Sequence, residues 1–436
     1  MMDPSLIATI CIFVMLAMMA LGIPVAISMI LVSAVGMLAT SGSAFTLTIF
    51  QTLPYNVASS YAFAAVPMFV LMGMIAGSTG IVGDIYRSAN MWLARVRGGL
   101  YMATTIASAA FGAVNGSTIV GAAVFARIAL PEMIKLGYNR GAAAGCIVGA
   151  GTFSAMIPPS ITILLYGVLT SESIGQLLIA GIVPGLLTAV IYLLGIALLV
   201  RLRPGWSPPP KTSHSLGERV ASLKSIWPIG IISVLVVGGI YSGFVAPSVA
   251  GAVGAFSVLM VGLAMRRIYR KELIGNIADT AVITASLFFI IMGGTAFSRL
   301  LLATGFVDDL LGLIRDTGLE PWMVILGLVG MYLVLGMLMD GVSMMVMTVP
   351  IVHPLATGLG YDPIWFAIIM IKLIELGCMT PPVGINIFAV VSAAEGQVKT
   401  REVFVGVIPF VLMEIIVLVV LLSAPSIVLW LPQAMM

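Results

Sequence analysis

The chain has 436 residues, of which 61% are hydrophobic and 8% are charged. A soluble domain carries about 25% charged residues, so most of this apolar surface can be hidden from water only in a lipid bilayer. This excludes a soluble enzyme, a disordered regulator and a disulfide scaffold, and the net charge of +3 gives no reason to expect a nucleic-acid partner.

Apolar runs long enough to cross a membrane recur along the whole chain. A spanning helix needs about 20 mostly apolar residues. We expect about ten spanning helices, over Leu6–Ala20, Pro24–Thr40, Ala62–Thr79, Arg140–Leu169, Leu177–Val200, Ile226–Ser242, Pro247–Met265, Ile277–Thr304, Pro363–Val391 and Phe404–Leu431. The chain is therefore predicted to be an all-α polytopic membrane protein.

Two further apolar stretches, Leu100–Leu130 and Trp322–Pro350, are interrupted midway by polar residues and glycine. The first interruption is Asn115-Gly116-Ser117-Thr118, and the second is Asp340-Gly341-Val342-Ser343. Each stretch predicts a re-entrant helical hairpin, because lipid tolerates a break only where its tip is buried in protein or faces water.

The positions of the positive charges agree with this arrangement. If both termini face outward and each hairpin returns to the side it entered, all but a few of the 20 Lys and Arg lie on one side. The positive-inside rule makes that side the cytoplasm, so both termini are predicted to be periplasmic.

The chain divides into two similar halves. In each half a span ends in Thr-Gly and is followed by a charged amphipathic segment, a broken hairpin, Gly-Tyr and a span interrupted by Pro-Pro. The predicted organisation is N-terminal scaffold helices over 1–83, a first half over 84–200, a cytoplasmic linker over 201–225, scaffold helices over 226–276, a second half over 277–403 and a C-terminal scaffold helix over 404–436. Opposite entry of the two hairpins makes the halves an inverted repeat, the arrangement of secondary transporters.

Helices broken within the bilayer supply binding groups. Free N–H groups at one end favour an anion, whereas carbonyl, hydroxyl and amide oxygens suit a small cation such as sodium. The candidate groups near the breaks are Asn115, Ser117, Thr118, Thr152, Ser154 and Ser160 in the first half and Gly336, Asp340, Ser343, Gly377, Thr380, Val383 and Asn386 in the second. Ordinary helix packing is the alternative for any one residue, but repetition of the pattern in both halves favours binding.

Ionisable residues inside spans are candidates for function or for pairing. Asp340 is placed to attract a cation or to cap the following helix. Arg299 is placed to hold an anionic substrate or to pair with Glu414 or Glu375. Lys372 and Glu375, three residues apart on one helix, are expected to form a local pair.

Two blocks of sequence resemble the large membrane (M) subunit of tripartite ATP-independent periplasmic (TRAP) transporters. They are Phe111–Ser117 with Ile157–Ile161, and Gly336–Asp340 with Gly377–Asn386, and the resemblance extends over essentially the whole chain. It implies a sodium-driven, elevator-type importer of an organic acid in a bacterial or archaeal inner membrane. It also implies two partners, a periplasmic substrate-binding (P) protein and a small four-helix membrane (Q) subunit.

The resemblance further implies sodium as the coupling ion, with no other cofactor. The positions that match the family's first sodium site are Gly112, Asn115, Ser154, Ile157 and Pro158, and those that match the second are Gly336, Gly377, Thr380 and Val383. For the substrate we expect contacts from Asn115, Ser117, Thr118, Thr152, Ser160, Asp340, Ser343, Asn386 and Arg299. The alternatives are a stand-alone divalent-anion/sodium symporter and a channel or non-transporting scaffold.

Overall fold

The computed structural model describes residues 3–210 and 214–435, and the described residues form helices and no strand. Residues 211–213 of the predicted linker lie outside the described residues. The chain begins with α1 (Pro4–Ala20), α2 (Val25–Ala58), α3 (Ala65–Ser78) and the amphipathic α4 (Ile81–Leu93). The side chain of Asp3 accepts a hydrogen bond from the backbone of Ser5 and so caps the start of α1.

The first predicted hairpin and the first broken span follow α4. The hairpin consists of α5 (Gly99–Asn115) and α6 (Thr118–Lys135). The broken span consists of α7 (Arg140–Gly151), α8 (Phe153–Met156) and α9 (Ile161–Thr170), and the axis bends by 44° at Pro158-Pro159. A long helix, α10 (Ile174–Leu202), completes this half.

The linker is largely polar and leads into three further helical segments. It contains the short turn η1 (Pro204–Trp206) and α11 (Leu216–Leu223). The next helical segment runs through α12 (Trp227–Ser233), the π-helical η2 (Val234–Gly238) and α13 (Gly239–Tyr241). It is followed by α14 (Pro247–Ala264) and α15 (Arg270–Thr304).

The second half repeats the order of the first. The amphipathic α16 (Phe306–Asp316) precedes a hairpin of α17 (Pro321–Gly336) and α18 (Gly341–Gly358). A broken span follows, made of α19 (Pro363–Met379) and α20 (Ile385–Ala393) with Pro381-Pro382 between them. The chain ends with α21 (Thr400–Ser423) and α22 (Ser426–Met435).

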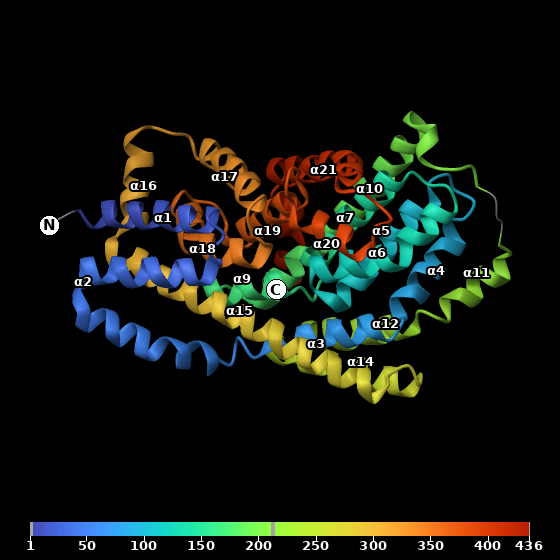
Figure 1. Cartoon of the computed structure of the whole chain (residues 1–436), viewed down its shortest axis with the longest axis horizontal. Helices are drawn as coiled ribbons and strands as arrows, with labels where there is room; N and C mark the ends of the chain where they lie inside the picture. Colours follow the sequence, from blue (N-terminus) through green and yellow to red (C-terminus); the bar gives the residue numbers. More distant parts are fainter. Residues whose placement is uncertain (1–2, 211–213, 436) are drawn as a thin grey trace.

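The two halves interlock through their hairpins. The second leg of the first hairpin, α6, packs against α20 of the second broken span, and the second leg of the other hairpin, α18, packs against α9 of the first. The helices α2, α3, α14 and α15 pack together along the lower side of Figure 1, with the hairpins and broken spans beside them. The fold is therefore an inverted repeat that surrounds a shared centre, as predicted.

Two helices, α7 and α21, touch backbone to backbone. A methyl group added at Gly145 would lie 2.3 Å from the carbonyl oxygen of Gly406, and one at Gly406 would lie 1.9 Å from that of Gly141. Only glycine allows this approach, which is the small-residue packing common among membrane helices. The first broken span is thus fixed to α21 from the other end of the chain.

Seven of the described helices are long and apolar enough to cross a membrane, or up to nine if each bent helix pair is one span. Large apolar side chains such as Val35, Leu194 and Leu198 are exposed, as lipid-facing side chains are. The 35-residue α15 is about 52 Å long at 1.5 Å per residue, more than a bilayer core of about 30 Å requires, which a tilted span accommodates.

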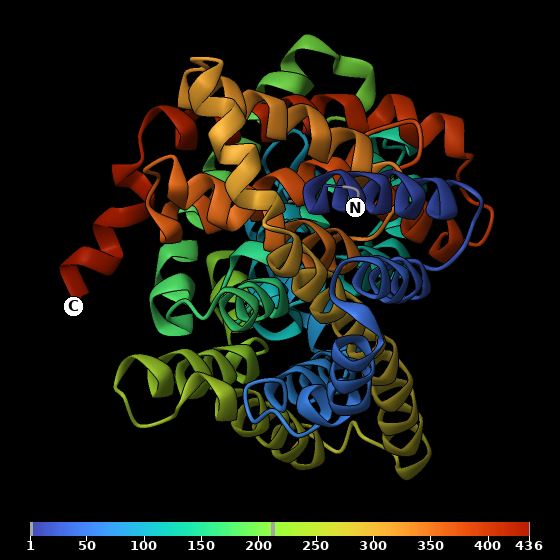
Figure 2. The same cartoon turned by 90° about the vertical axis from the view of Figure 1, so that its left-hand side faces the viewer.

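Two predicted boundaries need correction. The expected end of the second span at Thr40 corresponds to a break at Gly42, where φ is 81°, and helix α2 continues beyond it to Ala58 in a new direction (Figure 1). The last predicted span, Phe404–Leu431, is wrong as one helix. It ends at Ser423, because Pro425 removes a backbone donor, and α22 then turns aside to pack against α10 (Figure 2).

Candidate functional site

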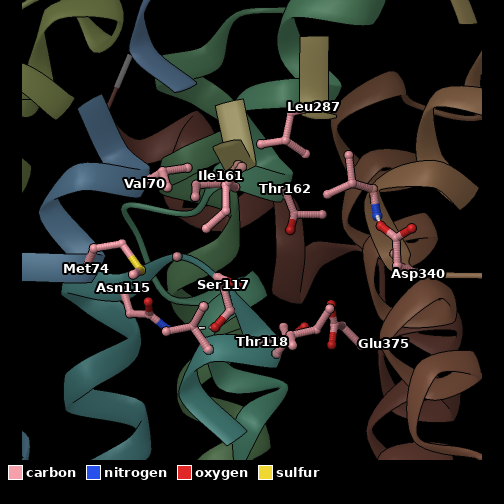
Figure 3. Close-up of a pocket in the computed structure, with 16 residues that line it drawn as sticks. Val70, Met74, Asn115, Ser117, Thr118, Ile161, Thr162, Leu287, Asp340 and Glu375 are labelled. Atoms are coloured by element: carbon pink, nitrogen blue, oxygen red, sulfur yellow. Dashed lines mark hydrogen bonds between the residues drawn. The ribbon is translucent and has the colours of Figure 1, made fainter. Parts of the chain in front are cut away.

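The tips of both hairpins open into one cavity of about 260 Å³ (Figure 3). Residues from Asn115 to Val120 contribute the first tip, and Asp340 to Val342 contribute the second. The rest of the wall comes from the start of α9, from α19 and from the apolar faces of α3 and α15, through Ile161, Thr162, Glu375, Val70, Met74, Ile283 and Leu287. The cavity therefore lies where the two halves meet, as the inverted repeat predicts.

The first tip leaves a helix N-terminus facing the cavity. Helix α5 ends at Asn115. It is followed by Gly116, whose φ of 63° glycine adopts without strain, and by Ser117, which is extended and directly precedes α6. The Asn115 amide donates a hydrogen bond to the Ser117 carbonyl at 2.6 Å, which holds the turn closed. Among the described residues no side chain caps α6, so the N–H groups of its first turn are open to an anion.

The residues matched to the first sodium site come together around Ser154. The Ser154 hydroxyl is buried without a hydrogen-bond partner among the described residues. A methyl group at Gly112 would lie 3.1 Å from the Ser154 Cα, and one at Gly121 would lie 3.1 Å from the Ser154 Oγ and 3.4 Å from the Asn115 Nδ2. Ile157 and Pro158 follow directly, where α8 ends in an extended residue.

The residues matched to the second sodium site also form one cluster. Gly336 at the end of α17 packs directly on Gly377 of α19, since a methyl group at Gly336 would lie 2.3 Å from the Gly377 Cα. At the break after α19, the carbonyl oxygens of Cys378 and Thr380 each lie 3.1 Å from the Cβ position of Gly384. The Thr380 hydroxyl donates to the Leu376 carbonyl at 2.5 Å, and Val383 is 39% exposed at the end of the break.

Asp340 caps the second hairpin and also lines the cavity. Its carboxylate accepts hydrogen bonds from the backbone N–H groups of Val342 and Ser343, both at 3.1 Å, and from the Ser343 hydroxyl. The capping interpretation of Asp340 is confirmed. Unlike α6, helix α18 therefore presents a satisfied N-terminus at the cavity.

Several residues expected to contact the substrate lie outside the cavity wall. Ser160 caps α9 through the backbone of Ile163, and Thr152 donates to the Glu414 carboxylate at 2.9 Å. Asn386 is fully buried on α20, and neither atom of its amide group has a partner among the described residues. Arg299 is exposed on α15.

The expected local pair of Lys372 and Glu375 is wrong. Lys372 does not pair with Glu375 but binds Glu414, with Nζ and Oε2 2.7 Å apart and both side chains 1% exposed. The other Glu414 oxygen accepts hydrogen bonds from Thr152 and, at 3.1 Å, from the Tyr192 hydroxyl. Glu414 is thus fully paired without Arg299, and it joins both broken spans to α10 and α21.

Glu375 is a site residue that the sequence reasoning missed. It lines the cavity on the same side as Asp340, is 2% exposed, and its Oε2 atom has no partner among the described residues (Figure 3). The sequence did carry a signal for Glu375, because an ionisable residue inside a membrane span is a candidate functional residue by default. Its position three residues after Lys372 instead favoured the interpretation that the two side chains form an ion pair on one helix.

This architecture defines a class of protein before any comparison is made. A polytopic helical membrane protein whose two inverted halves enclose one cavity with broken helices is built as a secondary transporter. The model of one family, described as "Tripartite ATP-independent periplasmic transporter, DctM component", matches residues 12–427, so the chain belongs to this family. The resemblance inferred from the sequence is confirmed.

Individual relatives extend over almost the same length. The C4-dicarboxylate TRAP transporter large permease of Pseudomonas aeruginosa is 32% identical, covering 87% of this chain and 88% of the relative. The ectoine/5-hydroxyectoine large permease of Ruegeria pomeroyi is 30% identical, covering 96% of each. Among solved structures, the YdaH transporter of Alcanivorax borkumensis gives a TM-score of 0.59 at 13% identity, covering 97% of this chain and 98% of that one, which is a likeness of fold alone.

Proposed function

We propose that this large TRAP permease imports an organic acid by coupling its uptake to sodium. The observation that carries the proposal is the pair of oxygen-rich breaks beside one cavity. The unpartnered Ser154 hydroxyl lies at the first break, and the convergent carbonyls of Cys378 and Thr380 lie at the second. Such oxygen atoms are the ligands that a small hard cation requires.

The uncapped start of α6 supplies the complementary group for the cargo. Free N–H groups and the helix dipole together favour a carboxylate at this end of the cavity. The names of the relatives give C4-dicarboxylate in one case and ectoine in another, so the family alone does not select the cargo.

An elevator movement fits the way the halves interlock. In our proposal the hairpins and broken spans move as one block, with α4 and α16 as amphipathic arms along the membrane surface. The family's tripartite description supports two partners, a periplasmic binding (P) protein that delivers the cargo and a small membrane (Q) subunit. We place the chain in the bacterial or archaeal inner membrane with both termini in the periplasm.

Replacing Thr380 with Val tests the second cation site. The substitution keeps the volume of the side chain but removes an oxygen, so the sodium concentration for half-maximal uptake should rise by about tenfold, the effect of one lost interaction of about 1.4 kcal/mol. Uptake is measured in proteoliposomes that contain the permease and its partners. The control is Thr46→Val, which removes a similar buried hydroxyl, bonded to the Gly42 carbonyl in α2, outside both breaks.

Two outcomes contradict the proposal. Uptake that does not depend on the sodium gradient would exclude sodium coupling. An unchanged sodium titration in Thr380→Val would exclude Thr380 from the second cation site. Full uptake by the permease without a binding protein instead favours the stand-alone divalent-anion symporter. Flux that does not saturate favours a channel.

A further inference from the structure

Helix α11 carries an apolar face that the rest of the described chain leaves largely uncovered. Leu216, Val220 and Leu223 recur at helical spacing, so their side chains share one side of this eight-residue helix. They are 73%, 56% and 43% exposed. The helix lies beside α4 at one end of the molecule (Figure 1). Apolar side chains gathered in this way indicate a surface that meets lipid or another chain.

The other side of α11 is fixed to α4. The hydroxyl groups of Ser222 and Ser88 are hydrogen-bonded at 2.9 Å, and both side chains are buried. Ser222 lies about 130° around the helix from the middle of the apolar face. The contact with α4 therefore turns Leu216, Val220 and Leu223 away from the protein.

The path of the chain brings α11 to the membrane surface. The apolar segment Trp227–Tyr241 follows shortly after α11 and enters the bilayer, and its axis is inclined to that of α11 by 42°. Because α11 itself contains Glu218 and Arg219, which the hydrocarbon core disfavours, it extends this segment into the headgroup layer and not across the core.

The surface around α11 is strongly positive. It consists of α4, of α11 with Lys224, and of the segment 266–272 that leads from α14 into α15, and it carries seven Lys and Arg but three Asp and Glu. These parts lie side by side, because Arg267 binds Asp84 of α4, and Ser88, which binds α11, lies one turn further along α4. Together they form a cationic surface at this end of the molecule (Figure 1).

The acidic side chains of the cationic surface are already engaged. Asp84 binds both Arg87 and Arg267. Glu218 and Glu272 accept hydrogen bonds from backbone N–H groups in the capping boxes of α11 and α15. The exposed cations that make no hydrogen bond or ion pair with any described residue are Lys224, Arg266, Arg270 and Lys271. Charge complementarity therefore favours an anionic partner beside the apolar face.

We propose that α11 docks on the surface of the lipid bilayer, with its apolar face among the acyl chains and the surrounding cations bound to the headgroups of anionic phospholipids. Helices that bind membranes in this way bury the apolar face about 5–10 Å deep and gain affinity from anionic lipids. In the orientation proposed above, this is the cytoplasmic surface. Because α11 bonds α4, the docked helix also holds α4 at the same surface.

The first test measures which quencher reaches the apolar face of the full chain in lipid nanodiscs. Val220→Cys is labelled with a small fluorophore, and Ala221→Cys is the matched control, because Ala221 is exposed about 100° around the helix from Val220. The three native cysteines are buried and so protected from the label. Lipids brominated on the acyl chain should quench Val220→Cys at least about threefold more than Ala221→Cys, and iodide in the water should show the reverse order.

The second test compares two brominated lipids on the labelled Val220→Cys protein. Phosphatidylglycerol should be preferred over phosphatidylcholine by about fivefold for each cation that contributes. Adding Lys224→Gln should lower this preference by about the same factor. Arg315→Gln is the charge-matched control, because Arg315 is exposed on α16 at the opposite end of the molecule (Figure 1).

Several results would overturn the proposal. Equal quenching by iodide at the two labelled positions places the apolar face in water. Protection of Val220→Cys from both quenchers places protein there instead, which is a second copy of the chain if the protection is lost in nanodiscs that hold a single copy. Equal quenching by the two lipids, or a preference unchanged by Lys224→Gln, excludes anionic headgroups as the partner. None of these measurements involves cargo or sodium, so the proposed function is tested separately.

Discussion

Replacing Lys372 with Met tests the buried network around Glu414. The substitution removes an ammonium group that lies 2.7 Å from the Glu414 carboxylate, where both side chains are 1% exposed. Breaking such a pair costs about 3–5 kcal/mol, because the remaining charge is left uncompensated. Glu414 keeps its hydrogen bonds from Thr152 and Tyr192, so we expect the lower end, a loss of about 3 kcal/mol in the free energy of unfolding.

The double variant Lys372→Met with Glu414→Gln separates lost charge balance from lost packing. Glutamine retains an oxygen that accepts from Thr152 and Tyr192 but carries no charge, so the double variant should unfold within about 1 kcal/mol of the unaltered protein. The free energy is measured by titration with a denaturing detergent, followed by tryptophan fluorescence. A single variant as stable as the original, or a double variant less stable than the single, would refute this account of the network.

Two further substitutions address packing and pH. Gly336→Ala should destabilise the protein by about 3 kcal/mol, because its methyl group would lie 2.3 Å from the backbone of Gly377. The control is Gly330→Ala on the same helix, whose methyl group would meet no atom within 4 Å and should leave the stability unchanged. Thermal unfolding compares the two variants. In the loop after α9, burial and the charge of Asp362 raise the pKa of Glu172 above its usual 4.5. The folded state then holds this proton more tightly than the unfolded state, so the stability of the protein should fall as pH rises from about the ordinary pKa through the raised one. Glu172→Gln should flatten that fall when thermal unfolding midpoints are measured across this pH range. A Glu172→Gln profile that parallels the original would exclude this carboxyl as the source.

Features that depend on neighbouring residues were predictable from the sequence. The breaks at Pro158-Pro159 and Pro381-Pro382 follow from the missing N–H of proline, and the turn at Gly116 follows from the conformational freedom of glycine. The capping of α18 by Asp340 is equally local. Because these signals repeat in both halves, the sequence also predicted the inverted repeat.

Features that depend on contacts between distant segments were not predictable in the same way. Lys372 has an acidic neighbour three residues away, yet it pairs with Glu414, 42 residues away, because α21 packs against α19. That pairing is what leaves Glu375 free to face the cavity. The packing of α22 against α10 and the new direction of α2 after Gly42 likewise depend on contacts between distant segments.

The contact between α7 and α21 has a mechanical consequence. Where Gly141 and Gly145 meet Gly406, no side chain separates the two backbones that could rearrange to absorb a shift. Sliding one helix along the other would drive carbonyl groups into each other within a fraction of a turn. Any displacement of the first broken span would therefore have to carry the N-terminal part of α21 with it, because the two backbones are in direct contact.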